Sequence, residues 1–399
     1  MKSPDRHGQT ASPDPHALPP PTAEEQAHGA RLQQRLREDI AARGGSISFA
    51  RFMELALYAP GLGYYAAGKH KFGAPGDFIT APELGALFAR CLARPCRSIL
   101  AQLGRGDILE TGAGSGALAA DLLLELETLG RLPERYLILE LSDELRDRQA
   151  ETLRLKAPHL LEHIHWLDAL PVDFRGVMLA NELLDAIPAE RFRITQNGVR
   201  QLHVAWQNDR FCWQENPADE AIRRRIESLA LPPGYTSEIN LQAEAWVRSA
   251  ADILKQGVML LVDYGFPRAE FYHPQRSDGT LMCHYRHRAH DDPLTLVGLQ
   301  DITAHVDFTA IAEAGTGTGT GLSLLGYTSQ AAFLIGCGLE QLMSASDPED
   351  IRAHLGLTQQ VKKLTSPHEM GELYKVIALG RGIQEPFPGF AAHDRRGRL

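Results

Sequence analysis

The sequence predicts an α/β protein built on a Rossmann-like parallel sheet, with an N-terminal helical cover and a later, substrate-facing insertion. Short apolar runs alternate with charged, helix-forming segments between residues 99 and 265, the pattern of a parallel sheet. A glycine-rich turn follows one apolar run, and acidic residues follow three of them. Ligands of such sheets gather at the carboxyl ends of the strands, so these glycines and acids mark the expected site.

The clearest motif is the stretch 107–116, in which an apolar run ends in Glu110 and is followed by Gly112, Gly114 and Gly116. Glycine permits positive φ and a close approach of the backbone to a ligand, and the start of the following helix would offer free N–H groups. The spacing differs from G-x-G-x-x-G, and a carboxylate before the glycines suits a cationic ligand better than a pyrophosphate. S-adenosylmethionine is therefore the favoured cofactor. A nicotinamide dinucleotide is the second candidate, and a loop without a ligand is the third.

Two further acids follow predicted strands. Glu140 lies at the end of the run 136–141, and Asp168 follows the run 164–166. An acid after the second strand is placed to bind ribose hydroxyls, which assigns Glu140 to the cofactor, and Asp168 would face the adenine amino group. Each acid alone could be an ordinary solvated side chain. Together with Glu110, three acids at consecutive strand ends favour one shared ligand.

The composition limits the partners. The chain has 399 residues and a formal net charge of −9, which argues against a mainly electrostatic nucleic-acid binder. Five scattered cysteines without a C-x-x-C pair predict reduced thiols and a cytoplasmic location. Asp5, Asp14 and Glu24 are acids that a mitochondrial presequence would avoid. No apolar run approaches the roughly 20 residues that span a bilayer, so no membrane partner is expected.

The N-terminal part is expected to form a leader and a cover. Residues 1–22, rich in Pro, Ser and His, predict a disordered leader, and residues 23–98 predict two amphipathic helices followed by a loop rich in glycine and aromatic residues. In that loop Asp77, Thr80 and Pro82 are candidate cofactor contacts. Turn capping by Asp77 or Thr80, with Pro82 in the first turn of a helix, is the competing interpretation.

The alternation of predicted strands and helices divides the rest of the chain into segments. The core is expected over 99–265 with a hairpin at 190–213, and an insertion or substrate lid over 266–330. The core is expected to end over 331–382 and to be followed by a loose tail at 383–399.

Histidines in the insertion raise the question of a metal. His284, His287 and His290 could act as ligands, but no H-E-x-x-H motif is present. The interleaved Arg286 and Arg288 would oppose a cation. No metal is therefore expected.

These motifs together resemble the MidA family of class I S-adenosylmethionine-dependent methyltransferases. The resemblance covers about residues 46–382, and the stretches that carry it are Phe52-Met53 with Leu57-Tyr58, Gly63-Tyr64-Tyr65, GDFITAPE at 76–83, ETGAGSG at 110–116, Ala180-Asn181-Glu182, Asp185-Ala186-Ile187-Pro188, Asp263-Tyr264-Gly265, Gly279-Thr280-Leu281, HRAH at 287–290, DITAHVDF at 301–308 and MGELYKV at 370–376. The octet at 301–308 is the most specific. Thr111 stands where the family usually has a smaller or apolar residue, and Ala89 where glycine is usual. Neither departure removes a carboxylate or a cofactor glycine.

The resemblance implies a class I methyltransferase fold, S-adenosylmethionine as cofactor, and an arginine side chain of a protein as methyl acceptor. The family includes a mitochondrial assembly factor that methylates an arginine of a complex I subunit. A protonated guanidinium needs an acid pair near the methyl group. Glu182 and Asp185 are chosen because residues three apart share one face of a helical turn. A structural cap before Pro188 is the competing interpretation of Asp185, and Asn181 is expected at the cofactor.

The insertion adds Asp301, His305 and Asp307 as candidate substrate residues. The expected partner is a protein substrate, with a complex I subunit as the acceptor that the resemblance suggests and a homodimer as the expected assembly. Two other functions remain open: an assembly chaperone that binds the cofactor structurally, and a small-molecule methyltransferase. The acidic balance disfavours a nucleic-acid substrate.

Overall fold

The computed structural model describes residues 18–67, 79–346, 349–384 and 387–399. Most of the expected leader, residues 1–17, and the candidate cofactor residue Asp77 lie outside these ranges.

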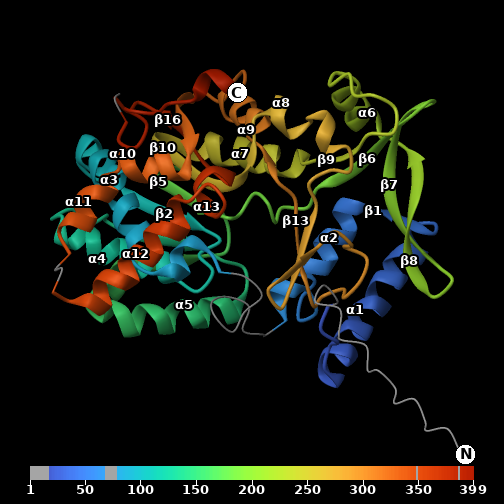
Figure 1. The fold of residues 1–399 in the computed structure, drawn as a ribbon, viewed down its shortest axis with the longest axis horizontal. Helices are drawn as coiled ribbons and strands as arrows, with labels where there is room; N and C mark the ends of the chain where they lie inside the picture. The colour runs from blue at the N-terminus through green and yellow to red at the C-terminus, as the bar shows by residue number, and fades with distance from the viewer. Residues whose placement is uncertain (1–17, 68–78, 347–348, 385–386) are drawn as a thin grey trace, which may run out of the picture.

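A seven-strand path forms the central sheet (Figure 1). Its order is β15 (Ser323–Ser329), β16 (Tyr374–Arg381), β10 (Leu254–Phe266), β5 (Phe174–Asn181), β2 (Asp107–Thr111), β3 (Tyr136–Leu139) and β4 (Ile164–Leu167). The five strands from β10 to β4 are parallel to one another, whereas β16 is antiparallel to both β10 and β15. The short β14 (Val306–Asp307) pairs with the end of β10. The carboxyl ends of the parallel strands therefore meet along one edge of the sheet.

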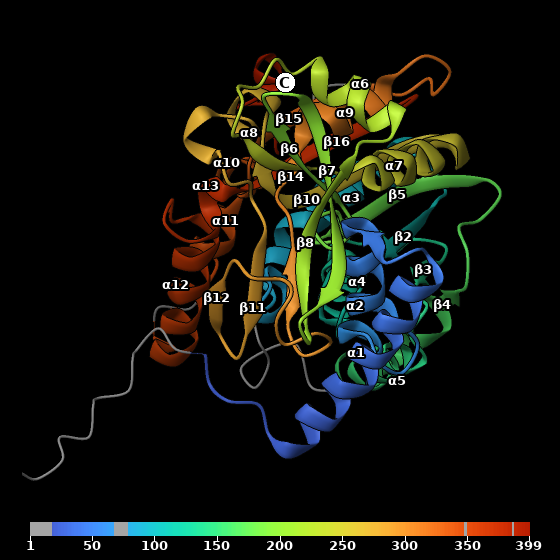
Figure 2. The ribbon, with the colours of Figure 1, turned by 90° about the vertical axis from the view of Figure 1, so that its right-hand side faces the viewer.

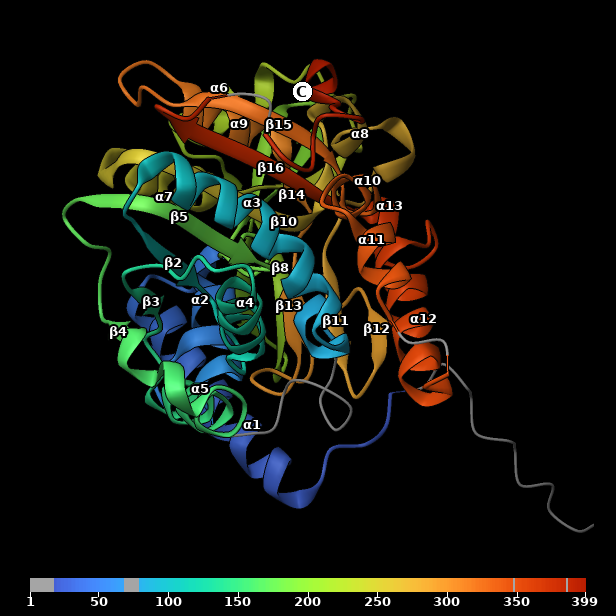
Figure 3. The same ribbon diagram turned by 90° about the vertical axis from the view of Figure 1, so that its left-hand side faces the viewer.

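Helices cover both faces of this sheet, because its strands are apolar on both sides. One face packs against α3 (Leu87–Leu103), α4 (Ala117–Thr128), α5 (Asp143–Lys156), α10 (Gln330–Gly336), α11 (Leu339–Ser344) and α12 (Ile351–Thr365). Figure 3 shows α3, α4, α5 and α12 on the near side. The other face packs against α7 (Leu241–Ile253) and α9 (Phe308–Thr316).

A second group of strands and helices lies beside the edge of the central sheet where the parallel strands end (Figure 2). It contains β1 (Ser46–Ser48), β7 (Gly198–Gln207), β6 (Glu190–Thr195) and β9 (Thr236–Ile239), with β8 (Arg210–Pro217) paired to β7. A small sheet of β12 (Arg288–His290), β11 (Met282–Tyr285) and β13 (Asp301–Thr303) joins it. The helices α1 (Ala23–Ala42) and α2 (Phe49–Tyr58) pack against these strands through their apolar faces. α6 (Glu220–Glu227) packs on the outer side of the five-stranded sheet.

Two segments in the C-terminal part of the chain differ from the expected domain organisation. Residues 323–329, expected inside the insertion, form the edge strand β15 of the central sheet. The tail expected to be loose is packed down: Phe387 and Phe390 are buried, and the Phe390 ring lies 5.1 Å from that of Phe333. Two aromatic side chains, which pack in the core beside α10, hold this segment in place. The Gly- and Arg-rich composition of the segment does not predict this packing. Among the described residues, no helix combines the length and the apolar character needed to cross a membrane.

Candidate functional site

A cavity of about 1020 Å³ opens at the carboxyl ends of β2, β3, β5 and β10. The glycine turn and the strand ends form one wall. The opposite wall comes from α2, from β11, and from the segment of β13 and β14. Parallel strands that end at one edge, with a loop-rich cover above them, place ligands in such a crevice. The volume is large enough for a nucleoside cofactor together with an acceptor side chain.

The glycine turn shapes the floor of the cavity. Gly112 and Gly114 line it with φ of 75° and 53°, and Gly116 starts α4 with φ of 82°. These are left-handed conformations that glycine adopts without strain. A Cβ on Gly116 would lie 3.0 Å from the Cα of Gln149, so the turn also packs tightly against α5. Gly116 therefore supports the turn from behind, whereas Gly112 and Gly114 face the cavity.

Two of the three predicted strand-end acids line the cavity. Glu110 is buried and accepts a 2.7 Å hydrogen bond from the hydroxyl of Tyr136, and burial raises its pKa to about 7. Glu140 accepts from the backbone N–H of Ser142 at 3.0 Å and from the side chain of Gln149 at 3.1 Å. Burial raises the pKa of Glu140 as well. These contacts hold both carboxyl groups in fixed positions.

Asp168 does not join them. Its side chain is 90% exposed and pairs with Arg146 at 2.6 Å, and it does not line the cavity. The strand β4 ends one residue earlier, and Arg146 also donates to the carbonyl oxygens of Leu167 and Glu140, so it draws Asp168 outward. At this end of the cavity the lining is mostly apolar, and includes Leu145 and Leu170.

The segment before α3 supplies two of the expected contacts and one that the sequence analysis missed. Thr80 and Pro82 line the cavity, and Thr80 makes no side-chain capping bond. Glu83 also lines it and accepts a hydrogen bond from the hydroxyl of Ser115 in the glycine turn. The match of residues 76–83 to the family was the signal that could have found Glu83.

The expected catalytic pair lies where β5 ends. Glu182 has φ of 50°, a left-handed conformation that is uncommon for a residue other than glycine and often marks functional sites. Asp263 holds this turn from the neighbouring strand β10, because its Oδ2 accepts from the N–H groups of Leu184 at 2.8 Å and Asp185 at 3.3 Å. The turn brings Glu182 and Asp185 onto the same wall of the cavity.

Each of the two carboxyl groups is oriented by a tyrosine. The hydroxyl of Tyr374 donates to Glu182 at 3.0 Å, and that of Tyr264 donates to Oδ2 of Asp185. Burial raises the pKa of Glu182 to about 8, with the charge of Asp185 as the next cause, and burial also raises the pKa of Asp185. The Oδ1 atoms of Asp185 and Asn181 are buried and have no hydrogen-bond partner within the described parts of the chain. Such acceptors are satisfied when a ligand brings a donor.

Aromatic and polar groups form the facing wall. Tyr58 and Tyr65 stack with their ring centres 5.5 Å apart, and the hydroxyl of Tyr65 donates to Asp301 at 2.8 Å. His305 also lines the cavity; its Nδ1 lies 3.1 Å from the carbonyl oxygen of Thr280. Burial lowers the pKa of His305 to about 4, so the ring is neutral at pH 7.

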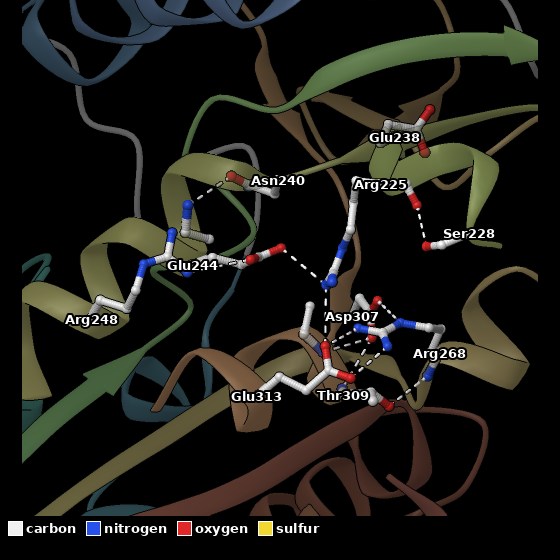
Figure 4. Close-up of polar contacts among 12 residues, drawn as sticks. Arg225, Ser228, Glu238, Asn240, Glu244, Arg248, Arg268, Asp307, Thr309 and Glu313 are labelled. Carbon is white, nitrogen blue, oxygen red and sulfur yellow. Dashed lines mark hydrogen bonds and ion pairs between the residues drawn. The ribbon is translucent and has the colours of Figure 1, made fainter. Parts of the chain in front are cut away.

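Asp307, the third substrate candidate, does not line this cavity, and Figure 4 shows it in a cluster of polar contacts with Arg268 and its neighbours. It caps α9 by accepting from the N–H groups of Thr309 and Ala310, and it pairs with Arg268 at 3.2 Å. Arg268 also pairs with Glu313 at 2.6 Å, and Glu313 in turn contacts Arg225 of α6 at 3.2 Å. Asp307 is therefore a structural residue that fixes the end of the segment carrying Asp301 and His305.

Replacement of Arg268 by leucine is expected to lower the free energy of unfolding by about 1–3 kcal/mol, because Asp307 would keep a mostly buried carboxylate without its charged partner. Urea unfolding followed by circular dichroism measures this. The control is Arg105→Leu, whose pair with Glu134 is mostly exposed and should change stability by no more than about 0.5 kcal/mol. Equal losses of unfolding free energy in the two variants would show that the network in Figure 4 stabilises the protein no more than an exposed ion pair does.

The three insertion histidines do not converge. In the β11–β12 pair, His290 lies opposite Cys283 and His284 opposite Ala289, so the two imidazoles leave opposite faces of the ribbon. His287 occupies the turn between them. Across the described residues, no group of three or more His, Cys, Asp or Glu side chains is arranged to hold a metal ion.

Comparison with known proteins identifies the family. Residues 91–328 match the family model described as "S-adenosyl-L-methionine-dependent methyltransferase". The chain belongs to this family. It is 30% identical over 376 residues to a zebrafish (Danio rerio) protein named "Protein arginine methyltransferase NDUFAF7, mitochondrial", with 84% of this chain and 83% of the relative covered. A Drosophila melanogaster homologue of the same name is 29% identical, with 90% and 86% covered.

A solved structure supports both the fold and the cofactor. A crystal structure from Burkholderia thailandensis with bound S-adenosyl-homocysteine is 46% identical and superposes with a TM-score of 0.93, covering 96% of this chain and 100% of that one. The class I methyltransferase fold predicted from the sequence is thus confirmed, and S-adenosylmethionine is the cofactor. The expectation of a cytoplasmic location is wrong, because the curated relatives are named as mitochondrial proteins. Scattered thiols and a few acids near the N-terminus do not define a compartment.

The residues present fit this cofactor. The buried Oδ1 of Asn181 needs a donor, which the amino group of S-adenosylmethionine carries, and Glu110 lies on the same cavity wall as a further partner for positive charge. Glu140 follows β3, which is the second parallel strand along the chain. In related folds, the acid at this position binds ribose hydroxyls. Gly112 and Gly114 let the backbone approach the ligand.

Proposed function

We propose that this methyltransferase methylates an arginine side chain of a protein. The observation that carries the proposal is a pair of carboxyl groups, the half-buried Glu182 and the buried Asp185, on one wall of the cavity, each with one oxygen held by a tyrosine hydroxyl. The unpaired Oδ1 of Asp185 requires a donor. A guanidinium offers a planar fork of donors and a positive charge, which matches two carboxylates better than a neutral acceptor does.

The aromatic wall supports the same acceptor. The rings of Tyr58 and Tyr65 stack at 24° to one another, and those of Tyr264 and Tyr374 meet edge to face with centres 5.3 Å apart. All four tyrosines line the cavity. Aromatic faces attract cations, arginine most often among side chains, and the stems of long side chains pack well against them. The cavity therefore combines paired negative charge with aromatic surfaces, as guanidinium recognition requires.

The reaction needs positioning and charge control. Bound S-adenosylmethionine supplies an electrophilic methyl group on a sulfonium. The carboxylates of Glu182 and Asp185 hold the guanidinium and draw its positive charge toward the nitrogens that do not attack, which leaves electron density on the attacking nitrogen. As the new N–C bond forms and the S–C bond breaks, that nitrogen loses a proton. Glu182, with a pKa of about 8, is suited to accept this proton and to release it to solvent.

The pH dependence follows from this assignment. Glu182 must be ionised to hold the guanidinium, and at pH 6 only about one molecule in a hundred of the free enzyme carries that charge. We expect kcat/KM to rise about tenfold per pH unit from pH 6 and to level off above pH 8. Tyr374→Phe removes a hydrogen bond that lowers the pKa of Glu182, so its profile should shift to higher pH. Flat profiles between pH 6 and 8 would contradict the role of Glu182.

The identity of the acceptor residue is tested by labelled transfer. The protein is incubated with S-[methyl-¹³C]adenosylmethionine and an extract of cells that lack it, and the proteins are then hydrolysed to amino acids. We expect labelled methylarginine, absent when the protein is omitted. Label in methyl-lysine, or only in the small-molecule fraction, would contradict the proposal. We also propose, from the family resemblance, that the acceptor protein is a subunit of respiratory complex I. We further propose that the enzyme works as a homodimer.

A further inference from the structure

A second cavity, of about 310 Å³, lies apart from the methyl-transfer site and has no role in the mechanism above. Its walls come from the ends of β10, β15 and β16 and from the C-terminal segment that packs beside them. Phe266 belongs to its lining, and the same ring stacks on His305, which lines the first cavity, with centres 5.4 Å apart. Leu373 lines both cavities. The two cavities are therefore neighbours, with Leu373 and the Phe266–His305 pair between them.

The second cavity contains a buried lysine. Lys375 is 7% exposed, and its ammonium donates to the carbonyl oxygen of Leu373 at 3.0 Å and to that of Glu372. An ammonium has three N–H donors, so one donor is left for another acceptor. Burial lowers the pKa of Lys375 to about 8, which means that its positive charge is incompletely compensated.

A buried tyrosine hydroxyl lies on the same side of the sheet. In the antiparallel pair β15–β16, Tyr327 is opposite Ile377 and Ser329 is opposite Lys375. Side chains two residues apart point to the same face, so Tyr327 and Lys375 are diagonal neighbours there. Tyr327 is 1% exposed, and its hydroxyl has no hydrogen-bond partner in the described part of the chain. A buried hydroxyl without a partner is rare and calls for a ligand or a water.

The remaining charges leave the cavity positive. Arg395 forms a two-pronged pair with Glu372 at 2.9 and 3.2 Å, and Arg398 pairs with Glu270 at 2.6 Å. Together with Lys375, three cations face two carboxylates in the lining. The arginine side chains are partly exposed and lie toward the solvent, whereas Lys375 and the hydroxyl of Tyr327 are enclosed. An anion could therefore enter past the arginines and reach two inner donors.

We propose that this cavity binds a small oxyanion, a carboxylate or a phosphate, between the ammonium of Lys375 and the hydroxyl of Tyr327. Such an anion would accept from both inner donors and balance the excess positive charge. The apolar lining from Phe266, Pro267 and Pro367 favours a carboxylate that carries a short apolar body over inorganic phosphate.

The test uses two simple probes with the full-length protein. Binding of trifluoroacetate is followed by ¹⁹F NMR line broadening, and binding of inorganic phosphate by ³¹P NMR at constant ionic strength. We expect the wild type to bind trifluoroacetate. Lys375→Met should weaken binding about tenfold or more, and Tyr327→Phe should weaken it several-fold. Tighter binding of phosphate than of trifluoroacetate would keep the site but reverse the preference.

Matched controls separate this site from general charge effects. Lys156→Met removes a lysine that pairs with Asp121 on the distant helix α4, and it should leave binding unchanged. Thermal melting checks that each variant is folded, and Tyr327→Phe decides the question if Lys375→Met does not fold. Equal broadening in the wild type and Tyr327→Phe, or an equal loss in Lys156→Met, would overturn the proposal.

Discussion

Replacement of Glu182 by glutamine is expected to lower kcat for methyl transfer by about a thousandfold or more, while the affinity for S-adenosylmethionine changes by less than about threefold. Glutamine keeps the size of the side chain and can still accept from the hydroxyl of Tyr374. It removes the negative charge that holds and polarises the guanidinium. Asp185→Asn should act in the same direction. Turnover with labelled donor gives kcat, and isothermal titration calorimetry gives the dissociation constant for the donor.

Asp168→Asn is the control for this experiment. Asp168 is also an acid that follows a strand of the sheet, but it is exposed and points away from the cavity. Its replacement should change neither turnover nor donor affinity. If Glu182→Gln turned over at the rate of Asp168→Asn, the carboxylate pair would have no part in the chemistry.

Replacement of Gly116 by valine is expected to weaken binding of S-adenosylmethionine more than a hundredfold. Gly116 has φ of 82°, where a β-branched residue is strained by about 1–3 kcal/mol. Its new Cβ would also meet the backbone of Gln149 at 3.0 Å, so the glycine turn and α5 would have to separate. Gln149 donates to Glu140 and to the carbonyl oxygen of Gly114, so this movement would disturb both sides of the cofactor site. Calorimetric titration with S-adenosyl-homocysteine measures the loss.

Gly130→Val separates steric conflict from backbone strain. Gly130 also has a positive φ, of 69°, but a Cβ there would meet nothing within 4 Å. This variant should lose some stability and keep its affinity for the cofactor. Thermal melting of both variants shows whether they are folded. Normal cofactor binding by a folded Gly116→Val protein would refute the role assigned to the turn.

Much of the site was predictable because it lies in the regular part of the fold. The carboxyl ends of parallel strands meet at one edge, so Glu110 and Glu140 could be placed together from the order of apolar runs, whereas the stretch from Asn181 to Asp185 was assigned with the family resemblance. The glycines after Glu110 fixed the position of the turn. Local sequence patterns are sufficient to place a site residue where the regular backbone geometry alone determines its position.

The errors about the positions of residues arise mainly from contacts between segments that are far apart in the sequence. Arg146 pairs with Asp168, and Arg268 pairs with Asp307; neither ion pair is visible in the spacing of the sequence. The tail was expected to be loose because its composition is polar, yet Phe387 and Phe390 bury themselves against a distant helix. The supporting tyrosines Tyr264 and Tyr374, far apart in the sequence, meet only once the sheet is assembled.

We expect a guanidinium to bind between Glu182 and Asp185, beside the bound cofactor. The most direct measurement is a crystal structure of the protein with S-adenosyl-homocysteine and ethylguanidinium at saturating concentration. We expect the guanidinium to lie within hydrogen-bond distance of both carboxyl groups, with one nitrogen facing the sulfur of the cofactor. A guanidinium bound elsewhere, or none in this cavity while the cofactor is in place, would contradict it.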